Sequence, residues 1–168
     1  MPTVSASVQE WVMMQQYARK YLSPLAKKFL NRLHLGKLTY LMVALKQFLF
    51  LTPFTVTVQT DTEGEQIFPK TWFATAMNQK YEGGGFKFCP DARPDDGLLD
   101  VIVLSGISRL KMLFCLPSAL WGGHTKIKGV HILKCRDVHI TSDYPLPVHK
   151  DGESGGIQRE FSVTIEKK

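Results

Sequence analysis

The chain has 168 residues, a formal net charge of +6 at pH 7, and 44% hydrophobic and 21% charged residues. This length fits one domain with an ordinary core, and this composition excludes an intrinsically disordered chain. The positive charge favours anionic partners such as membrane lipids or nucleotides, although charge alone does not choose among them.

The N-terminal third, about residues 8–52, is predicted to be helical. Ser23-Pro24 is an N-cap and first-turn pair, and apolar residues then recur at helical spacing up to Gly36. A second helix is expected from about Leu38 to Leu49. Basic residues flank the apolar stripe, which is typical either of a helix packed on its own domain or of one that meets anionic lipid. They are Arg19, Lys20, Lys27, Lys28, Arg32 and Lys37.

Residues 53–168 are predicted to be rich in β-strands, because the apolar period changes from 3.6 to 2 at Phe54, Val56 and Val58. Short strands between Gly, Pro and Asp turns indicate a mainly β (α+β) fold, a sandwich of antiparallel strands with the N-terminal helices packed against it. A helix from Ser108 to about Leu120 is expected to end or kink at Pro117. The other expected strands are Gln66–Asn78, Gly85–Cys89, Leu98–Leu104, Val130–Cys135, Val138–Thr141, Leu146–His149 and Arg159–Glu166.

The stretch Asn78–Val101 contains the most informative motifs. Three consecutive glycines, Gly83-Gly84-Gly85, are costly in backbone entropy unless the chain adopts positive φ or passes close to something. They precede an expected strand and not a helix, so we interpret them as a turn and not as a phosphate cradle. Pro94-Asp95-Asp96-Gly97 is a strong turn signal. Such a turn either simply joins two strands or directs carboxylate and carbonyl oxygens at a hard cation.

A second Asp-Gly pair, Asp151-Gly152, is followed directly by the carboxylate of Glu153. A carboxylate on a tight turn can act as a general base when partial burial raises its pKa. The alternative is an exposed acidic turn that only joins two strands.

Together these motifs resemble the C-terminal half of the diacylglycerol kinase superfamily, which includes soluble bacterial diacylglycerol kinases and sphingosine-kinase-like enzymes. The resemblance runs from about Gly36 to the end of the chain. It departs at Gln79, Phe86 and Lys150, where the family often has glycine, methionine and an apolar residue. The matching residues are Asn78, Tyr81, Gly83, Gly84, Gly85, Pro90, Ala92, Asp96, Gly97, Leu98, Leu99, Asp100, Gly123, His124, Asp151, Gly152 and Glu153.

The resemblance implies transfer of the γ-phosphoryl group of ATP to a hydroxyl of diacylglycerol or a related lipid. Glu153 would deprotonate the lipid hydroxyl, and Asp151 would orient Glu153 or bridge to a metal. A magnesium site, apart from the nucleotide-bound magnesium, would combine the Asp96 carboxylate with the main-chain carbonyls of Arg93 and Leu98. Asp91, Asp95 and Asp100 could contribute to it through water.

The sequence contains no GxxxxGK[ST], no GxGxxG and no Gly-Gly-Asp-Gly-Thr motif to hold the phosphates of ATP. The resemblance therefore implies a nucleotide-binding domain N-terminal to Met1, without which this chain is inactive. The competing interpretation is a stand-alone lipid- or anion-binding module with the same fold. A homodimer is left open, and no nucleic-acid motif accompanies the positive charge.

The first residues, MPTVSASVQEW, lack the pattern of a secretory signal, and the three cysteines are scattered. The apolar tract Leu38–Phe54 is interrupted by Lys46 and Gln47 and falls short of a membrane span. We therefore expect a cytoplasmic protein that is peripheral at a membrane surface. The five histidines, His34, His124, His131, His139 and His149, show no metal-ligand spacing and are left without a role.

Overall fold

The computed structural model describes residues 4–6, 52–82, 85–150 and 153–165. The expected N-terminal helices, with their basic residues, lie outside these ranges, as do Gly83, Gly84, Asp151 and Gly152. Within the described ranges, no helix is long and apolar enough to cross a bilayer.

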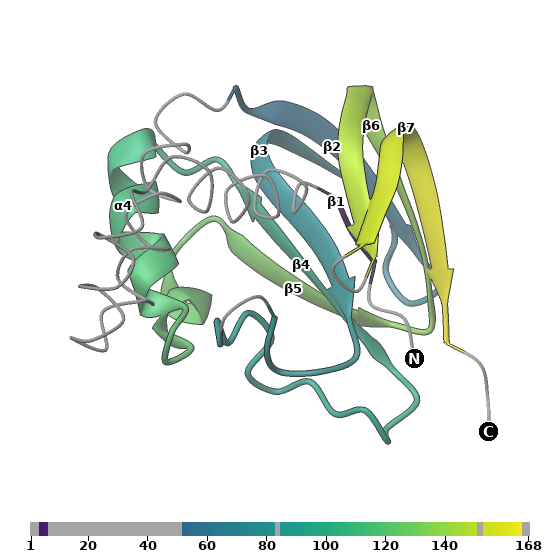
Figure 1. Ribbon diagram of the computed structural model, residues 1–168, viewed down its shortest axis with the longest axis horizontal. Coiled ribbons are helices and arrows are strands. Elements are labelled where there is room, and N and C mark those ends of the chain that lie inside the picture. Colours follow the sequence, from purple (N-terminus) through teal and green to yellow (C-terminus); the bar gives the residue numbers. More distant parts are fainter. Residues whose placement is uncertain (1–3, 7–51, 83–84, 151–152, 166–168) are drawn as a thin grey trace, which may run out of the picture.

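The described strands form one hydrogen-bonded sheet in which every pairing is antiparallel, which confirms the predicted mainly β fold (Figure 1). The path across it is β1-β6-β2-β3-β4-β5, with β7 paired on the other side of β6. The strands are β1 (Val4–Ala6), β2 (Phe54–Thr60), β3 (Gly64–Met77), β4 (Leu99–Ser105), β5 (Val130–Cys135), β6 (Asp137–Lys150) and β7 (Glu153–Thr164).

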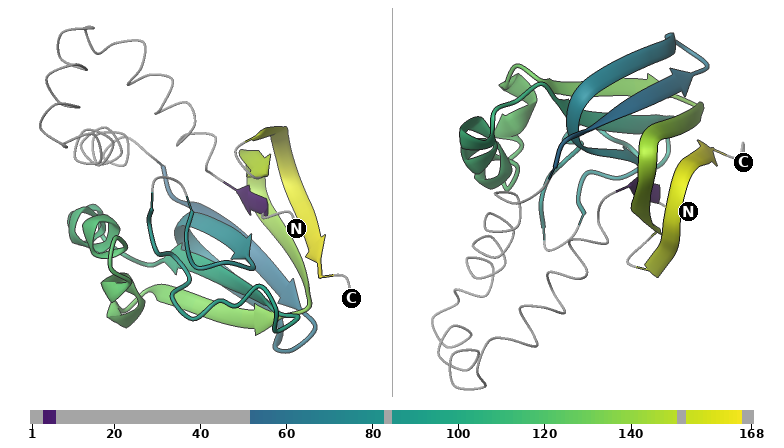
Figure 2. Two further views of the ribbon diagram at one scale, coloured as in Figure 1. Left: turned by 60° about the horizontal axis from the view of Figure 1, so that its bottom comes forward. Right: turned by 90° about the horizontal axis from the view of Figure 1, so that it is seen from above.

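Strands β1 and β2 lie end to end between the two longest strands, β3 and β6. Along β3, Phe54 of β2 pairs with Thr71 and Ala6 of β1 pairs with Ala74. Along β6, β2 pairs with the first half and β1 with the last residues. The sheet bends along this line, so that β6 and β7 face β3, β4 and β5 as in a sandwich (Figure 2).

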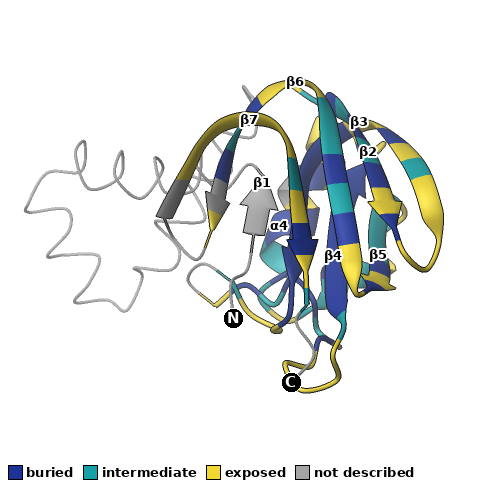
Figure 3. Cartoon of the chain, turned by 90° about the vertical axis from the view of Figure 1, so that its right-hand side faces the viewer, coloured by how far each residue is buried: buried dark blue, intermediate teal, exposed yellow. Residues whose placement is uncertain are grey.

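Strand β4 is buried along its whole length and separates two apolar cores (Figure 3). Because side chains alternate along a strand, Val101 and Val103 face the β6–β7 layer while Ile102 and Leu104 face the helix α4. The first core also holds Val56, Val58, Ala74, Leu133, Val138, Ile140 and Val163, and the second holds Phe73, Phe86, Phe88, Met112, Cys115 and Leu116.

Helix α4 (Arg109–Ser118) confirms the predicted helix and is followed by the 3₁₀ helix η1 (Gly123–Lys126). The Ser108 hydroxyl caps α4 by accepting a hydrogen bond from Lys111 N–H at 3.4 Å. Pro117 stands in the last turn, where the helix ends one residue later. The loss of its N–H therefore does not break the helix.

The predicted strand Gly85–Cys89 is wrong. Glu82 and Phe86 exchange two backbone hydrogen bonds, of 2.9 and 3.1 Å, and Gly85 has a φ of 93°. Gly85 thus belongs to a tight reversal of the chain. The residues after Phe86 form an irregular segment, which packs over the face of the sheet that α4 covers. The strands predicted around Val138–Thr141 and Leu146–His149 merge into β6. Its register shifts lie between Thr141 and Leu146, where Pro145 stands, and directly after Pro147.

Candidate functional site

The strand register brings both Asp-Gly segments to the same end of the sheet. Lys150, the last residue of β6, pairs with Val4. Val4 also pairs with Ala76, and Ala76 pairs with Val101 near the start of β4. Lys150 at the end of β6 and Val101 near the start of β4 are therefore separated by three strand spacings, roughly 14 Å.

The loop before β4 contains Asp96 in a side-chain-stabilised turn. Its Oδ1 accepts a hydrogen bond from the Leu98 N–H at 2.9 Å, and Gly97 has a φ of 71°. This arrangement is an Asx-turn, in which a short acidic side chain holds its own backbone. The predicted turn is therefore present, and the Asp96 side chain stays exposed to solvent.

The oxygen atoms around Asp96 fit a magnesium ion that is held by few protein ligands. The hydrogen bond to Leu98 N–H uses Oδ1, which leaves the other carboxylate oxygen for a cation. In the described part of the chain, no three His, Cys, Asp or Glu side chains are gathered as metal ligands. A cation here would rely on one carboxylate, main-chain carbonyls and water, which is a set that Mg²⁺ accepts.

A buried carboxylate lies next to this loop, at the start of β4. Asp100 is 1% exposed, and its Oδ1 lies 3.2 Å from Nζ of Lys134 on β5. Burial raises the pKa of Asp100, whereas the hydrogen bond and charge of Lys134 lower it. The negative charges of Asp96 and Asp91 raise this pKa further, so the acidic groups at this end of the sheet are electrostatically coupled.

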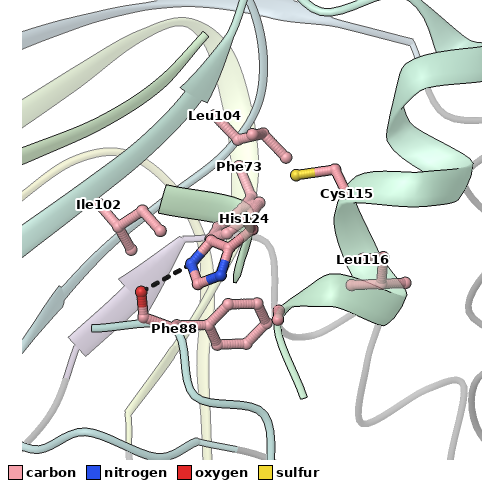
Figure 4. Close-up of a pocket in the computed structure, with 8 residues that line it drawn as sticks. Phe73, Phe88, Ile102, Leu104, Cys115, Leu116 and His124 are labelled. Atoms are coloured by element: carbon pink, nitrogen blue, oxygen red, sulfur yellow. Dashed lines mark hydrogen bonds between the residues drawn. The ribbon is translucent and has the colours of Figure 1, made fainter. Parts of the chain in front are cut away.

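His124, which the sequence left without a role, connects η1 to the segment before β4. Its Nε2 lies 2.9 Å from the carbonyl oxygen of Phe88, and the ring is 2% exposed (Figure 4). Burial lowers the pKa of His124, which favours the neutral ring. A carbonyl only accepts, so Nε2 carries the proton and donates it, and Nδ1 is a buried acceptor with no hydrogen-bond partner in the described ranges.

This imidazole lines a small apolar cavity between α4 and the sheet (Figure 4). The cavity has a volume of about 10 Å³, which is space for about one water molecule. The thiol of Cys115 lines the cavity from α4. Burial raises the pKa of this thiol to about 11, so it is neutral and unreactive. The other lining residues are Phe73, Phe88, Ile102, Leu104, Leu116 and Ala119.

The predicted catalytic residues are placed only in part. Glu153 is the first residue of β7, and its backbone pairs with Lys150, so Asp151 and Gly152 are the two residues that join the strands. The side chain of Glu153 lies outside the described part of the structure, as do Asp151 and Gly152. Their catalytic roles stay predictions, as does the role of Asp96 as a ligand with the carbonyls of Arg93 and Leu98.

The chain belongs to the family defined by the YegS C-terminal NAD kinase beta sandwich-like domain, whose model matches residues 23–164. This confirms the resemblance to diacylglycerol kinases. YtlR of Bacillus subtilis, provisionally named a lipid kinase, is 33% identical over 133 residues, which cover 79% of this chain and 42% of that protein. A diacylglycerol kinase of Mycobacterium tuberculosis H37Rv is 29% identical over 118 residues, covering 70% of this chain and 38% of the enzyme.

Among solved structures, a Bacillus anthracis protein with a provisional diacylglycerol kinase title superposes with a TM-score of 0.55 at 19% identity. The match covers 76% of this chain and 44% of that one, and at this identity it shows the fold alone. The chain therefore spans less than half the length of these relatives.

Proposed function

We propose that residues 1–168 are the single C-terminal domain of an ATP-dependent lipid kinase, which phosphorylates a hydroxyl of diacylglycerol or a related lipid. The observation that supports this proposal is the register that brings the end of β6, which precedes Asp151, and the start of β4, which follows the Asp96 loop, to one end of the sheet. Phosphoryl transfer to an alcohol needs a group that accepts the hydroxyl proton, and Glu153 is the candidate for this role, while the Asp96 loop would hold a structural cation nearby.

In this proposal, Glu153 accepts the proton of the lipid hydroxyl and Asp151 orients Glu153. Asp96 holds Mg²⁺ together with the carbonyls of Arg93 and Leu98, and the bound ion supplies positive charge at this end of the domain. A nucleotide-binding domain outside this chain supplies ATP, because the sequence contains no phosphate-binding motif.

The names of two relatives support a lipid as the substrate, because YtlR is provisionally named a lipid kinase and the Mycobacterium tuberculosis protein is named a diacylglycerol kinase. We accordingly propose a cytoplasmic protein that works at an anionic membrane surface in phospholipid metabolism.

A chimaera tests this function. The corresponding C-terminal segment of YtlR is replaced by this chain, and transfer of labelled phosphate from ATP to diacylglycerol in mixed micelles is measured. We expect transfer by the chimaera and its loss in the Glu153→Gln chimaera. A folded chimaera that binds both ATP and lipid but transfers no phosphate would instead favour the non-catalytic lipid- or anion-binding module.

A further inference from the structure

Helix α4 is apolar on two faces. Its inner side places Met112, Cys115 and Leu116 in the core against the sheet. Its outer side exposes Leu110 by 66% and Phe114 by 70%, and these two residues share a face because they are four positions apart. Large apolar side chains on the solvent side of a short helix are normally covered by a partner, so this exposed side indicates a binding surface.

The apolar surface continues beyond the end of α4. Trp121 follows in a turn and is 68% exposed. Its backbone N–H donates a hydrogen bond to the carbonyl oxygen of Ser118 at 3.3 Å. Tryptophan is the side chain most typical of a membrane interface, because its ring is apolar and its N–H can remain hydrated. We use the name outer surface of α4 for the set Leu110, Lys111, Phe114, Trp121, Lys126 and Lys128.

The positive charge of this region indicates which kind of partner binds there. Between Asp100 and Asp137 the sequence contains no acidic residue but six basic ones. Lys111, Lys126 and Lys128 are exposed and form no ion pair within the described ranges. Because η1 packs on α4, the lysines at and after η1 lie at the same edge of the molecule. The six are Arg109, Lys111, Lys126, Lys128, Lys134 and Arg136.

From the exposed apolar side chains and this uninterrupted positive charge, we infer that the outer surface of α4 docks on an anionic lipid bilayer. Phe114 and Trp121 enter the interfacial region, and the three lysines contact lipid phosphates. The surface lies at the edge of the molecule opposite β7 (Figure 1). The inference does not rest on the proposed phosphoryl transfer.

Vesicle binding by the 168-residue chain, without ATP, tests the inference. Co-sedimentation is measured with phosphatidylcholine vesicles and with vesicles that also contain phosphatidylglycerol. We expect binding to the anionic vesicles only. Replacing Lys111, Lys126 and Lys128 by Gln should weaken it roughly 100-fold, since each surface cation contributes about 1 kcal/mol.

The double variant Phe114→Gln/Trp121→Gln tests the contribution of the apolar side chains. It should weaken binding at least roughly tenfold, because two large apolar side chains no longer leave water. Ile157→Gln is the matched control, because Ile157 is 73% exposed and belongs to β7, the strand on the opposite side of the molecule from α4. This control should bind as wild type does.

Three outcomes would overturn the inference. One is failure of the wild-type chain to bind anionic vesicles, and another is unchanged binding by both surface variants. The third is an oligomer that the Phe114→Gln/Trp121→Gln variant dissociates while vesicle binding stays intact, which would assign the surface to a second copy of the chain. Circular dichroism establishes that each variant is folded.

Discussion

Asp100 and Lys134 are direct partners across the β4–β5 pair, and their side chains meet at 3.2 Å between Oδ1 and Nζ. The pair is asymmetric, because the Asp100 side chain is 1% exposed and that of Lys134 is 43% exposed. Lys134 can therefore be solvated when its partner is lost, whereas Asp100 cannot.

This asymmetry predicts unequal effects of the two single substitutions. Lys134→Met should lower the free energy of unfolding by about 1–3 kcal/mol, the cost of leaving a buried polar group without its partner. Asp100→Asn should lower it less, because the amide remains a hydrogen-bonding group and the lysine reaches water. Urea denaturation at neutral pH measures both, and an equal loss in the two variants would contradict the asymmetry.

The titration of Asp100 gives a second prediction. Burial raises its pKa above 3.8, and Lys134 opposes this shift. Since the folded state holds the proton more tightly, the contribution of Asp100 to stability is fully present below pH 3.8 and is lost as the pH rises through the raised pKa. Carbon-13 NMR of the carboxyl group should show the raised pKa, and Lys134→Met should raise it further. A pKa at or below 3.8 would show that Lys134 outweighs burial.

His124 should make folding sensitive to pH in the opposite direction. Burial lowers its pKa below 6.5, so the unfolded state binds the proton more tightly. Its contribution to stability is therefore fully present above pH 6.5 and declines as the pH falls toward the lowered pKa. Gln at this position retains a donor for the Phe88 carbonyl but does not titrate. Urea denaturation across this pH range should show a shallower pH dependence for His124→Gln than for wild type.

The strands that follow a simple alternation could be predicted from the sequence. Phe54, Val56 and Val58 are all buried on one side of β2, as their alternation with threonine predicts. The strand predicted after Gly85 is wrong because Phe86 and Phe88 show the same alternation. They are buried in the core, but their segment does not pair with a neighbouring strand. Local periodicity reports which side chains are buried, whereas strand pairing depends on a partner distant in sequence.

The site was predicted unevenly for a similar reason. Asp96 and Gly97 carry a local turn signal, and the turn is present. The role of His124 depends on Phe88, which lies 36 positions earlier, and no local pattern predicts that contact. The pair Gly123-His124 within the family resemblance was the one available signal. The Asp100–Lys134 pair likewise depends on the β4–β5 register, which the sequence pattern does not contain.

Gly129 and Gly64 allow a matched test of whether the space around a glycine excludes a side chain. Gly129 and Gly64 have φ values of 104° and 73°, so alanine is strained at both. A Cβ at Gly129 would also overlap the Ser105 carbonyl and lie 2.6 Å from the side chain of Ile107, whereas nothing lies within 4 Å at Gly64. Gly129→Ala should therefore lower the melting temperature clearly more than Gly64→Ala does. Equal shifts would show that the β4–α4 connection adjusts to the added methyl group.

The last prediction concerns Glu153 in the kinase chimaera. Glu153→Gln should leave folding and ATP affinity near wild type while lowering kcat roughly 10²–10⁴-fold, the usual contribution of a general base. The amide has nearly the same shape but does not accept a proton at neutral pH, so the loss should fall on kcat and not on KM. Glu160→Gln is the matched control, because Glu160 lies on the same strand and is exposed, and its carboxylate contacts His139 Nε2 at 3.6 Å on the strand surface.

Asp96→Asn should behave differently from Glu153→Gln. If Asp96 holds a structural Mg²⁺, its loss should lower the melting temperature together with activity, and excess Mg²⁺ should partly restore both by mass action. A proton acceptor and a cation ligand thus predict separate patterns, one confined to chemistry and the other shared with stability. Wild-type turnover by the Glu153→Gln chimaera would remove Glu153 from the mechanism and leave the Asp151-Gly152 pair as a connection between β6 and β7.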